Sequence, residues 1–197
     1  GMIMPGNEKS NRALLIAQIG HTLRNMQSFV EKLQESGILS GRDDVRFSIV
    51  GFHSTATVIV ADSNARYRAH AEEAERNVKA FQETGGTSYK SWFDAMIPLV
   101  GQDEHVLLSV CTDGGCQEWD TFWKSYESWA RRDRTETICV GFGAWLNEVT
   151  VRRIASAEHH LVDSPATVGS SLFQLMARGL SRLLLRFTIT IASEHEL

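Results

Sequence analysis

The 197-residue sequence has few cysteines and few prolines, with three of each, and it lacks any long apolar run. Cys111, Cys116 and Cys139 are too few and too scattered for a disulfide-stabilised secreted fold, and their odd number leaves one unpaired. No stretch approaches the roughly 20 apolar residues that span a bilayer. We therefore expect a cytoplasmic protein in a reducing compartment, with no membrane partner.

An excess of positive charge is also missing. The formal net charge is −4, which gives no overall attraction to phosphate backbones, so nucleic acid is not an expected partner. What is present is an ordinary globular composition: 43 % of the residues are hydrophobic, including nine Phe and five Trp. That apolar content predicts a substantial core and excludes disorder over most of the length.

Apolar runs typical of buried strands alternate with segments of helical periodicity. The expected strands are 12–19, 45–52, 55–61, 105–112, 135–142 and 160–163, and the expected helices are 22–35, 70–82, 88–100, 118–131, 147–155 and 168–185. Two of these strands, 45–52 and 55–61, are separated so closely that they indicate an antiparallel hairpin. The order predicts a three-layer α/β/α fold, with a mostly parallel central sheet and one antiparallel edge strand.

The predicted domain boundaries follow from the same pattern. Residues 1–10 are polar and are expected to form a flexible leader, in which Gly1 before Met2 is interpreted as an expression scar. Residues 11–186 are expected to form one domain. Residues 187–197 are expected to be a tail, whose segment FTITIA alternates like an extra strand with an undetermined partner.

Five segments in a fixed order resemble the von Willebrand factor A (vWA) domain family. They are a buried strand that opens the domain, the hairpin VRFSIVGFHSTATVIV, the turn GGTS, an apolar strand ending in TDG, and the segment ICVGFG. The resemblance covers residues 11–185. It implies a Rossmann-like fold and a metal-ion-dependent adhesion site (MIDAS), in which a first-strand motif Asp-x-Ser-x-Ser, a later Thr and a later Asp bind a divalent ion.

The resemblance carries over to this chain only in part. Thr87 in GGTS matches the family's Thr, and Asp113 in TDG matches its later Asp. The first motif reads QIGHT, so that Gln18 replaces the leading Asp, Gly20 replaces the first Ser and Thr22 replaces the second. Because Mg²⁺ is usually held through one or two carboxylates, a site with Asp113 alone is expected to bind Mg²⁺ weakly or not at all.

In sheets of this type, ligands bind beyond the carboxyl ends of the strands. We therefore expect a partner protein to bind a rim at that edge, and the vWA resemblance implies the same. The rim residues are Gln18, Gly20, His21, Thr22, Gly86, Thr87, Ser88, Asp113, Gly114 and Trp119. Trp119, Trp123 and Tyr126 recur at helical spacing, which favours a buried stripe, but an exposed Trp119 would be the first contact candidate.

The expected function is therefore that of a non-enzymatic, adaptor-type protein-binding module. Small stand-alone relatives of this type resemble those of bacterial tellurite-resistance and chaperone-ATPase-linked operons. Two alternatives stay open from the sequence. One is a small hydrolase on a related three-layer scaffold, which uses Asp113 or a cysteine. The other is a structural subunit whose tail FTITIA extends the sheet across a homodimer.

Overall fold

The computed structural model of the protein describes residues 5–40, 44–82, 87–112, 115, 118–143 and 146–194; for 5–12 and 185–194 it describes the backbone alone. The helices are α1 (Pro5–Glu35), α2 (Arg68–Ala80), α3 (Tyr89–Met96), α4 (Asp120–Ala130), α5 (Glu148–Ile154) and α6 (Val168–Glu194), with 3-10 turns η1 (Ile97–Leu99) and η2 (Pro165–Thr167). The strands are β1 (Arg46–Phe52), β2 (Ala56–Asn64), β3 (Val106–Thr112), β4 (Thr135–Phe142) and β5 (Glu158–Val162).

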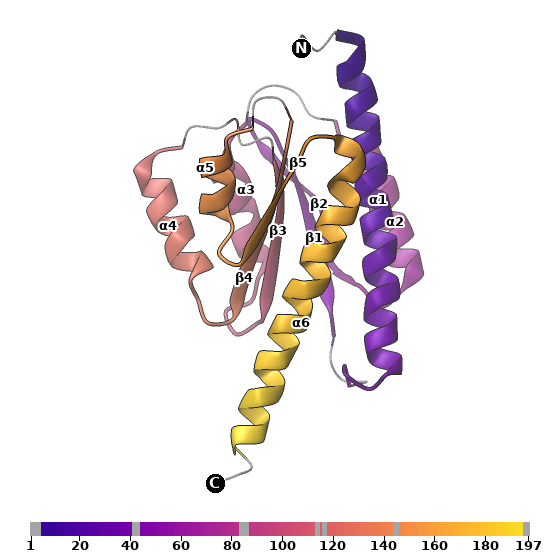
Figure 1. The fold of residues 1–197 in the computed structure, drawn as a ribbon, viewed down its shortest axis with the longest axis vertical. Coiled ribbons are helices and arrows are strands. Elements are labelled where there is room, and N and C mark those ends of the chain that lie inside the picture. The colour runs from indigo at the N-terminus through magenta and orange to yellow at the C-terminus, as the bar shows by residue number, and fades with distance from the viewer. Residues whose placement is uncertain are drawn as a thin grey trace.

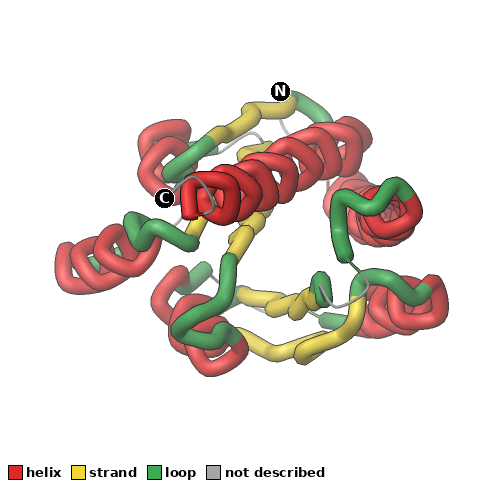
Figure 2. The backbone as a smooth tube through the Cα atoms, turned by 90° about the horizontal axis from the view of Figure 1, so that it is seen from below, coloured by secondary structure: helices red, strands yellow, loops and turns green. Residues whose placement is uncertain are grey.

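The strands form two sheets in the described part of the chain. Strands β3, β4 and β5 pair in that order, all parallel, whereas β1 and β2 form a separate antiparallel hairpin. Helices cover both faces of the strands, so the expected three-layer α/β/α class is confirmed (Figure 1). Figure 2 shows the same arrangement from below, with helices on both sides of the strands.

Side chains of β3 alternate between the two faces, as they do along any strand. Leu108 and Val110 belong to an aromatic core formed with α3, α4 and α5. Leu107 and Cys111 instead pack with α6 and with Leu15 of α1. Helices α3, α4 and α5 therefore lie on one face of the sheet, and α1 and α6 lie on the other.

The aromatic stripe of α4 accounts for much of the first core. Phe122, Trp123, Tyr126 and Trp129 are all buried, and each makes an edge-on contact with an aromatic ring of α3: Tyr126 with Trp92, Phe122 and Trp129 with Phe93, and Trp123 with Tyr89. Tyr126 also donates a hydrogen bond to the carbonyl oxygen of Ile154 at 2.5 Å, so its buried hydroxyl is satisfied. The expected burial of the stripe is thus confirmed for Trp123 and Tyr126 but is wrong for Trp119, which is 80 % exposed.

Two predicted strands are wrong. Residues 12–19 belong to α1, which runs without interruption to Glu35, and residues 187–192 belong to α6. A continuous apolar run fits a buried helix as well as a buried strand, and the Leu, Ala, Gln and Arg of RALLIAQI are good helix formers. Residues 5–10, expected as a leader, are helical as well.

The remaining expected elements are present, with ends shifted by a few residues. The hairpin pairs Phe52 with Ala56 at its turn. Helix α1 ends where expected, because Gly37 takes the left-handed φ of +77° and the amide of Leu39 donates back to the carbonyl of Leu33 at 3.1 Å. The predicted domain limits at residues 11 and 186 stay predictions.

Candidate functional site

The amino terminus of α3 joins the carboxyl ends of two strands from different sheets. The amide of Ser88 donates to the carbonyl oxygen of His53, directly after β1, at 2.8 Å. The hydroxyl groups of Tyr89 and Thr112, the last residue of β3, share a buried hydrogen bond of 2.8 Å. The ends of β1 and β3 therefore lie at one edge of the molecule, which we call the rim.

Glu118, just before α4, binds the first residues of α3 at the rim. One of its carboxylate oxygens accepts from the amides of Tyr89 at 2.5 Å and Lys90 at 3.0 Å, and from the hydroxyl of Ser88 at 3.3 Å. The first amides of a helix have no partner within the helix and favour negative charge. Glu118, which precedes α4, thus caps α3 and fixes the start of α4 to the start of α3.

Sequence reasoning missed Glu118, although it named Ser88. Ser88 is the N-cap of α3, and its side chain accepts from the amide of Ser91. A serine two residues after a Gly-Gly pair signals such a cap locally. A carboxylate that lies 29 residues beyond Tyr89 gives no local signal, because only the fold brings it to the helix end.

The expected rim residues fall into three groups. Thr87, Ser88 and Trp119 lie at the rim, where Thr87 and Ser88 are partly buried. Gly86, Asp113 and Gly114 lie outside the described residues. The third group, Gln18, Gly20, His21 and Thr22, lies within α1 instead of following a strand.

The α1 group is engaged with neighbouring helices. The Thr22 hydroxyl, which is buried, contacts the carbonyl oxygens of Gln18 at 2.9 Å and Gly169 at 3.1 Å, so it packs α1 against the start of α6. His21 contacts Arg24, and Arg24 pairs with Glu75 of α2. The match of QIGHT to the family's first motif therefore loses its basis, since that motif ends a strand and QIGHT lies in mid-helix.

The residues present do not fit the expected metal site. Gln18 and Thr22 face the α6 layer, whereas Ser88 and Tyr89 open the α3 layer on the opposite face. Across the described ranges, no group of three or more His, Cys, Asp or Glu side chains could hold a metal ion. We therefore derive no chemistry through a bound cation.

The thiols that the structure describes are not activated. Burial raises the pKa of Cys111 to about 12, and it raises the pKa of Cys139 well above its usual value. Both side chains are therefore protonated near neutral pH and are poor nucleophiles. The hydrolase alternative gains nothing from these two cysteines.

The rim also presents two large apolar side chains to solvent. Trp119, the N-cap of α4, is 80 % exposed, and Val149, in the first turn of α5, is 74 % exposed. Helices α4 and α5 follow the parallel neighbours β3 and β4, so both helices begin at the same edge of the sheet. These are the two most exposed large hydrophobic side chains among the residues whose burial is described.

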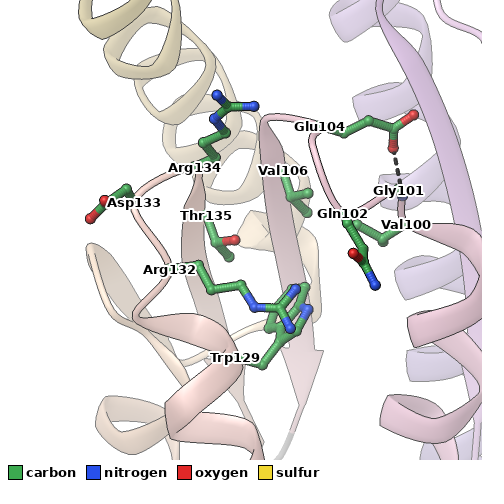
Figure 3. A pocket seen from close by; sticks show the side chains of 10 residues that line it. All are labelled: Val100, Gly101, Gln102, Glu104, Val106, Trp129, Arg132, Asp133, Arg134 and Thr135. Carbon is green, nitrogen blue, oxygen red and sulfur yellow. Dashed lines mark hydrogen bonds between the residues drawn. The ribbon is translucent and has the colours of Figure 1, made fainter.

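A small cavity lies at the other edge of the sheet. It has a volume of about 140 Å³ and is lined by Trp129, Arg132 and Thr135, among others (Figure 3). Figure 3 shows Arg132 and Trp129 lying together below the start of β4, and Glu104 bonded to the amide of Gly101. None of the expected rim residues lines this cavity.

Within the described residues, no helix has both the length and the apolar composition for a membrane span.

Comparisons with known proteins agree on the architecture. No family model and no curated protein sequence matches the chain. A von Willebrand factor type A structure from Catenulispora acidiphila superposes with a TM-score of 0.66 at 16 % identity, covering 87 % of this chain and 39 % of that one. The protein has a vWA-like fold. The resemblance to the vWA family is thereby confirmed at the level of fold, although the first of its five segments is helical and not a strand.

Two further vWA-like matches differ in how much of each chain they cover. The conserved hypothetical protein BatB from Bacteroides thetaiotaomicron matches with a TM-score of 0.57 at 14 % identity, over 82 % of this chain and 87 % of BatB. Proximal thread matrix protein 1 from the mussel byssus, with a zinc-occupied MIDAS motif, matches with a TM-score of 0.56 at 15 % identity, over 81 % of this chain and 43 % of its own. The chain thus spans about two fifths of two of these vWA-like structures and most of the third.

Proposed function

We propose that the protein is a non-enzymatic binding module whose rim docks another protein. The observation that carries this proposal is the exposure of Trp119 and Val149 at the edge where parallel strands end. Tryptophan is enriched among the residues that dominate binding energy at protein interfaces. A solvent-exposed indole also costs the isolated protein hydration free energy, which burial against a partner would recover.

The polar surroundings of Trp119 suit such an interface. Glu118, the residue before Trp119, accepts hydrogen bonds from the first amides of α3, so the chain beside the indole is held in place. A core of apolar side chains with a polar surround is the usual anatomy of a binding surface. Partner docking in this form needs no metal ion, because the contact rests on burial of Trp119 and Val149.

The exchange of Trp119 for alanine tests this proposal directly. We expect Trp119→Ala to weaken binding of a captured partner by about 30-fold, because loss of an interface tryptophan commonly costs about 2 kcal/mol or more. The partner is first captured with the unaltered chain and identified by mass spectrometry. Its affinity for each purified variant is then measured by calorimetry.

The matched control is Ile38→Ala. Ile38 is 62 % exposed but follows the carboxyl end of α1 and precedes β1, so it lies at the edge opposite the rim. We expect this variant to bind the partner with unchanged affinity. Equal loss of affinity in Trp119→Ala and Ile38→Ala would reject the rim as the docking surface. Unchanged affinity in both Trp119→Ala and a second rim variant, Val149→Ala, would reject it as well.

A further inference from the structure

The sheet is interrupted between β1 and β3. Among the described strands, β1 pairs only with β2, and β3 pairs only with β4, so each has one unpaired edge. Unpaired edges in the middle of an α/β molecule are unusual, because backbone N–H and C=O groups there need partners. We call this interruption the sheet break.

The two edges of the sheet break face a common neighbour. Tyr89 of α3 packs against Phe52 of β1, with ring centroids 6.1 Å apart, and it bonds Thr112 of β3. A helix with its side chains is about 10–12 Å wide, and neighbouring strands lie about 4.8 Å apart. One helix is therefore wide enough to touch β1 and β3 across about two strand spacings, and because β1 and β3 do not pair with each other, one strand can fit between them.

The same contacts fix the direction of the two edges. His53, directly after β1, and Thr112, at the end of β3, both contact the first residues of α3. Strands β1 and β3 therefore run in the same direction and end at the rim. A strand placed between them can run parallel to both.

Helix α1 covers the sheet break on the other face. Its main neighbours in the described chain are α2, α6 and η2, whereas each of the other five helices packs closely against a strand. Helix α6 covers β3, β4 and β5, and α2 covers β2. Helix α1, which lies between α2 and α6, therefore covers the interval between β2–β1 and β3 (Figure 1).

Burial along the strands shows the same interruption. Strand β4 has a partner on each side and is buried from Thr135 through Gly141. Strand β3 has the apolar sequence VLLSVCT and helices on both faces, yet only Val110 and Thr112 are fully buried. On α1, the apolar residues Leu15, Ile16 and Ile19 are also only partly buried. Side chains typical of a closed core thus stay partly exposed around the break.

The handedness of the connections indicates where the missing strand would be joined. Strand progression from β3 to β4 to β5 passes through α4 and α5 on one face of the sheet. A crossover from a strand in the break to β1 moves across the sheet in the opposite direction. It is right-handed only if its connecting helix lies on the other face of the sheet. Helix α1 lies on that other face and leads directly into β1.

We propose that a β-strand joined to the amino-terminal end of α1, supplied by polypeptide ahead of residue 1, occupies the sheet break. It runs parallel to β1 and β3 and unites the two sheets into one of six strands. Its side chains are apolar on both faces, because α3 lies on one side of it and α1 on the other. Its carboxyl end lies at the rim.

The test adds such a strand to the 197-residue chain. A seven-residue Val-, Ile- and Thr-rich strand, as long as β3, is fused ahead of residue 1 through ten Gly and Ser residues. Helix α1 extends 13 residues ahead of the Gln18–Gly169 contact, or about 20 Å, which about six extended residues can span. A fusion of the same length made only of Gly and Ser is the matched control.

Backbone hydrogen exchange is the readout. We expect the strand fusion to slow exchange about tenfold or more at alternate amides of β1 and β3, with no change at the outer edges of β2 and β5. Unchanged exchange in β1 and β3 would overturn the proposal. Equal slowing of exchange at the outer edges of β2 and β5 would also overturn it. Slower exchange in β1 and β3 with the free strand peptide, but not with the fusion, would overturn it too, because the break would then accept a strand from a partner.

Discussion

At the scale of single residues, close contacts between helices determine where α1 can lie. Gly169, near the start of α6, is such a position, because an added Cβ would lie 2.5 Å from the Gln18 side-chain oxygen and 2.9 Å from the Gln18 carbonyl oxygen. The side chain can move aside, but the backbone carbonyl of α1 cannot move without shifting the helix. The seating of α1 on α6 therefore depends on this glycine.

We predict that Gly169→Ala lowers the free energy of unfolding by about 1–3 kcal/mol, the usual cost of overpacking. Gly179→Ala, elsewhere in α6, is the matched control, because its Cβ would meet only the end of the flexible Leu107 side chain, at 2.6 Å. We expect that control to be nearly neutral, since alanine favours the helix. Urea unfolding measures both variants, and a stabilised Gly169→Ala would show that α1 does not pack there.

At the scale of elements, a charge cluster attaches α6 to β4 and β5. Arg182 of α6 donates to Glu136 at 2.9 Å and to Glu158 at 2.8 Å, and Glu136 is only 2 % exposed. The hydrogen bond from Arg182 lowers the pKa of Glu158, and the charges of Arg178 and His160 act in the same direction. Glu158 thus contributes stability above its unfolded pKa, and that contribution is lost as the pH falls through the lowered value.

We predict that Arg182→Met costs about 3–5 kcal/mol at about pH 7, because it removes the guanidinium that pairs with the buried Glu136 carboxylate. At about pH 4 the penalty shrinks, because Arg182 lowers the pKa of Glu158 and the wild-type chain loses that ion-pair stability as the pH falls towards the lowered pKa. Urea unfolding at both pH values measures this. Arg178→Met, which removes a more exposed partner of Glu158 at 3.4 Å, is expected to cost about 1 kcal/mol or less. An equal penalty at both pH values would contradict the assignment.

The sequence predicts these elements unevenly, for physical reasons. The hairpin strands and β4 are short runs rich in β-branched and aromatic residues, and α2 has a helical period, so the predicted ends of these elements lie within a few residues of the observed ones. The run RALLIAQI has neither period, so length and context decide its form. The β-branched tail FTITIA has the period of a strand, and the structure continues α6 through it against local propensity.

The candidate site was predictable only where chain order and topology agree. Thr87 and the end of β3 were expected at one edge because the family resemblance places both at its metal site, and the bond between Tyr89 and Thr112 brings the start of α3 to the end of β3. QIGHT was expected beside them because the predicted strand 12–19 ends there and because it resembles the family's first motif, but it lies in α1 instead. Glu118 and the exposure of Val149 depend on how separate elements meet, which no local pattern encodes.

At the scale of the whole molecule, the sheet break divides the protein into two parts of unequal stability. Both hydrophobic cores include side chains of the parallel sheet, whereas the β1–β2 hairpin packs mainly against α3 on one face and α2 on the other, with α1 packed on α2. Segments with fewer buried contacts and more exposed backbone hydrogen bonds open more readily. The hairpin is therefore expected to open before the parallel sheet does.

Native-state hydrogen exchange of the 197-residue chain measures this difference directly. We predict the slowest exchange in β4, which is buried and paired on both sides, and exchange faster by about tenfold or more in β1 and β2. Strand β3 is expected to divide by alternate residues, since amides bonded to β4 are protected and those at the unpaired edge are not. Uniformly slow exchange across β1, β3 and β4 would mean that the strand edges at the break are already closed in the chain as it stands.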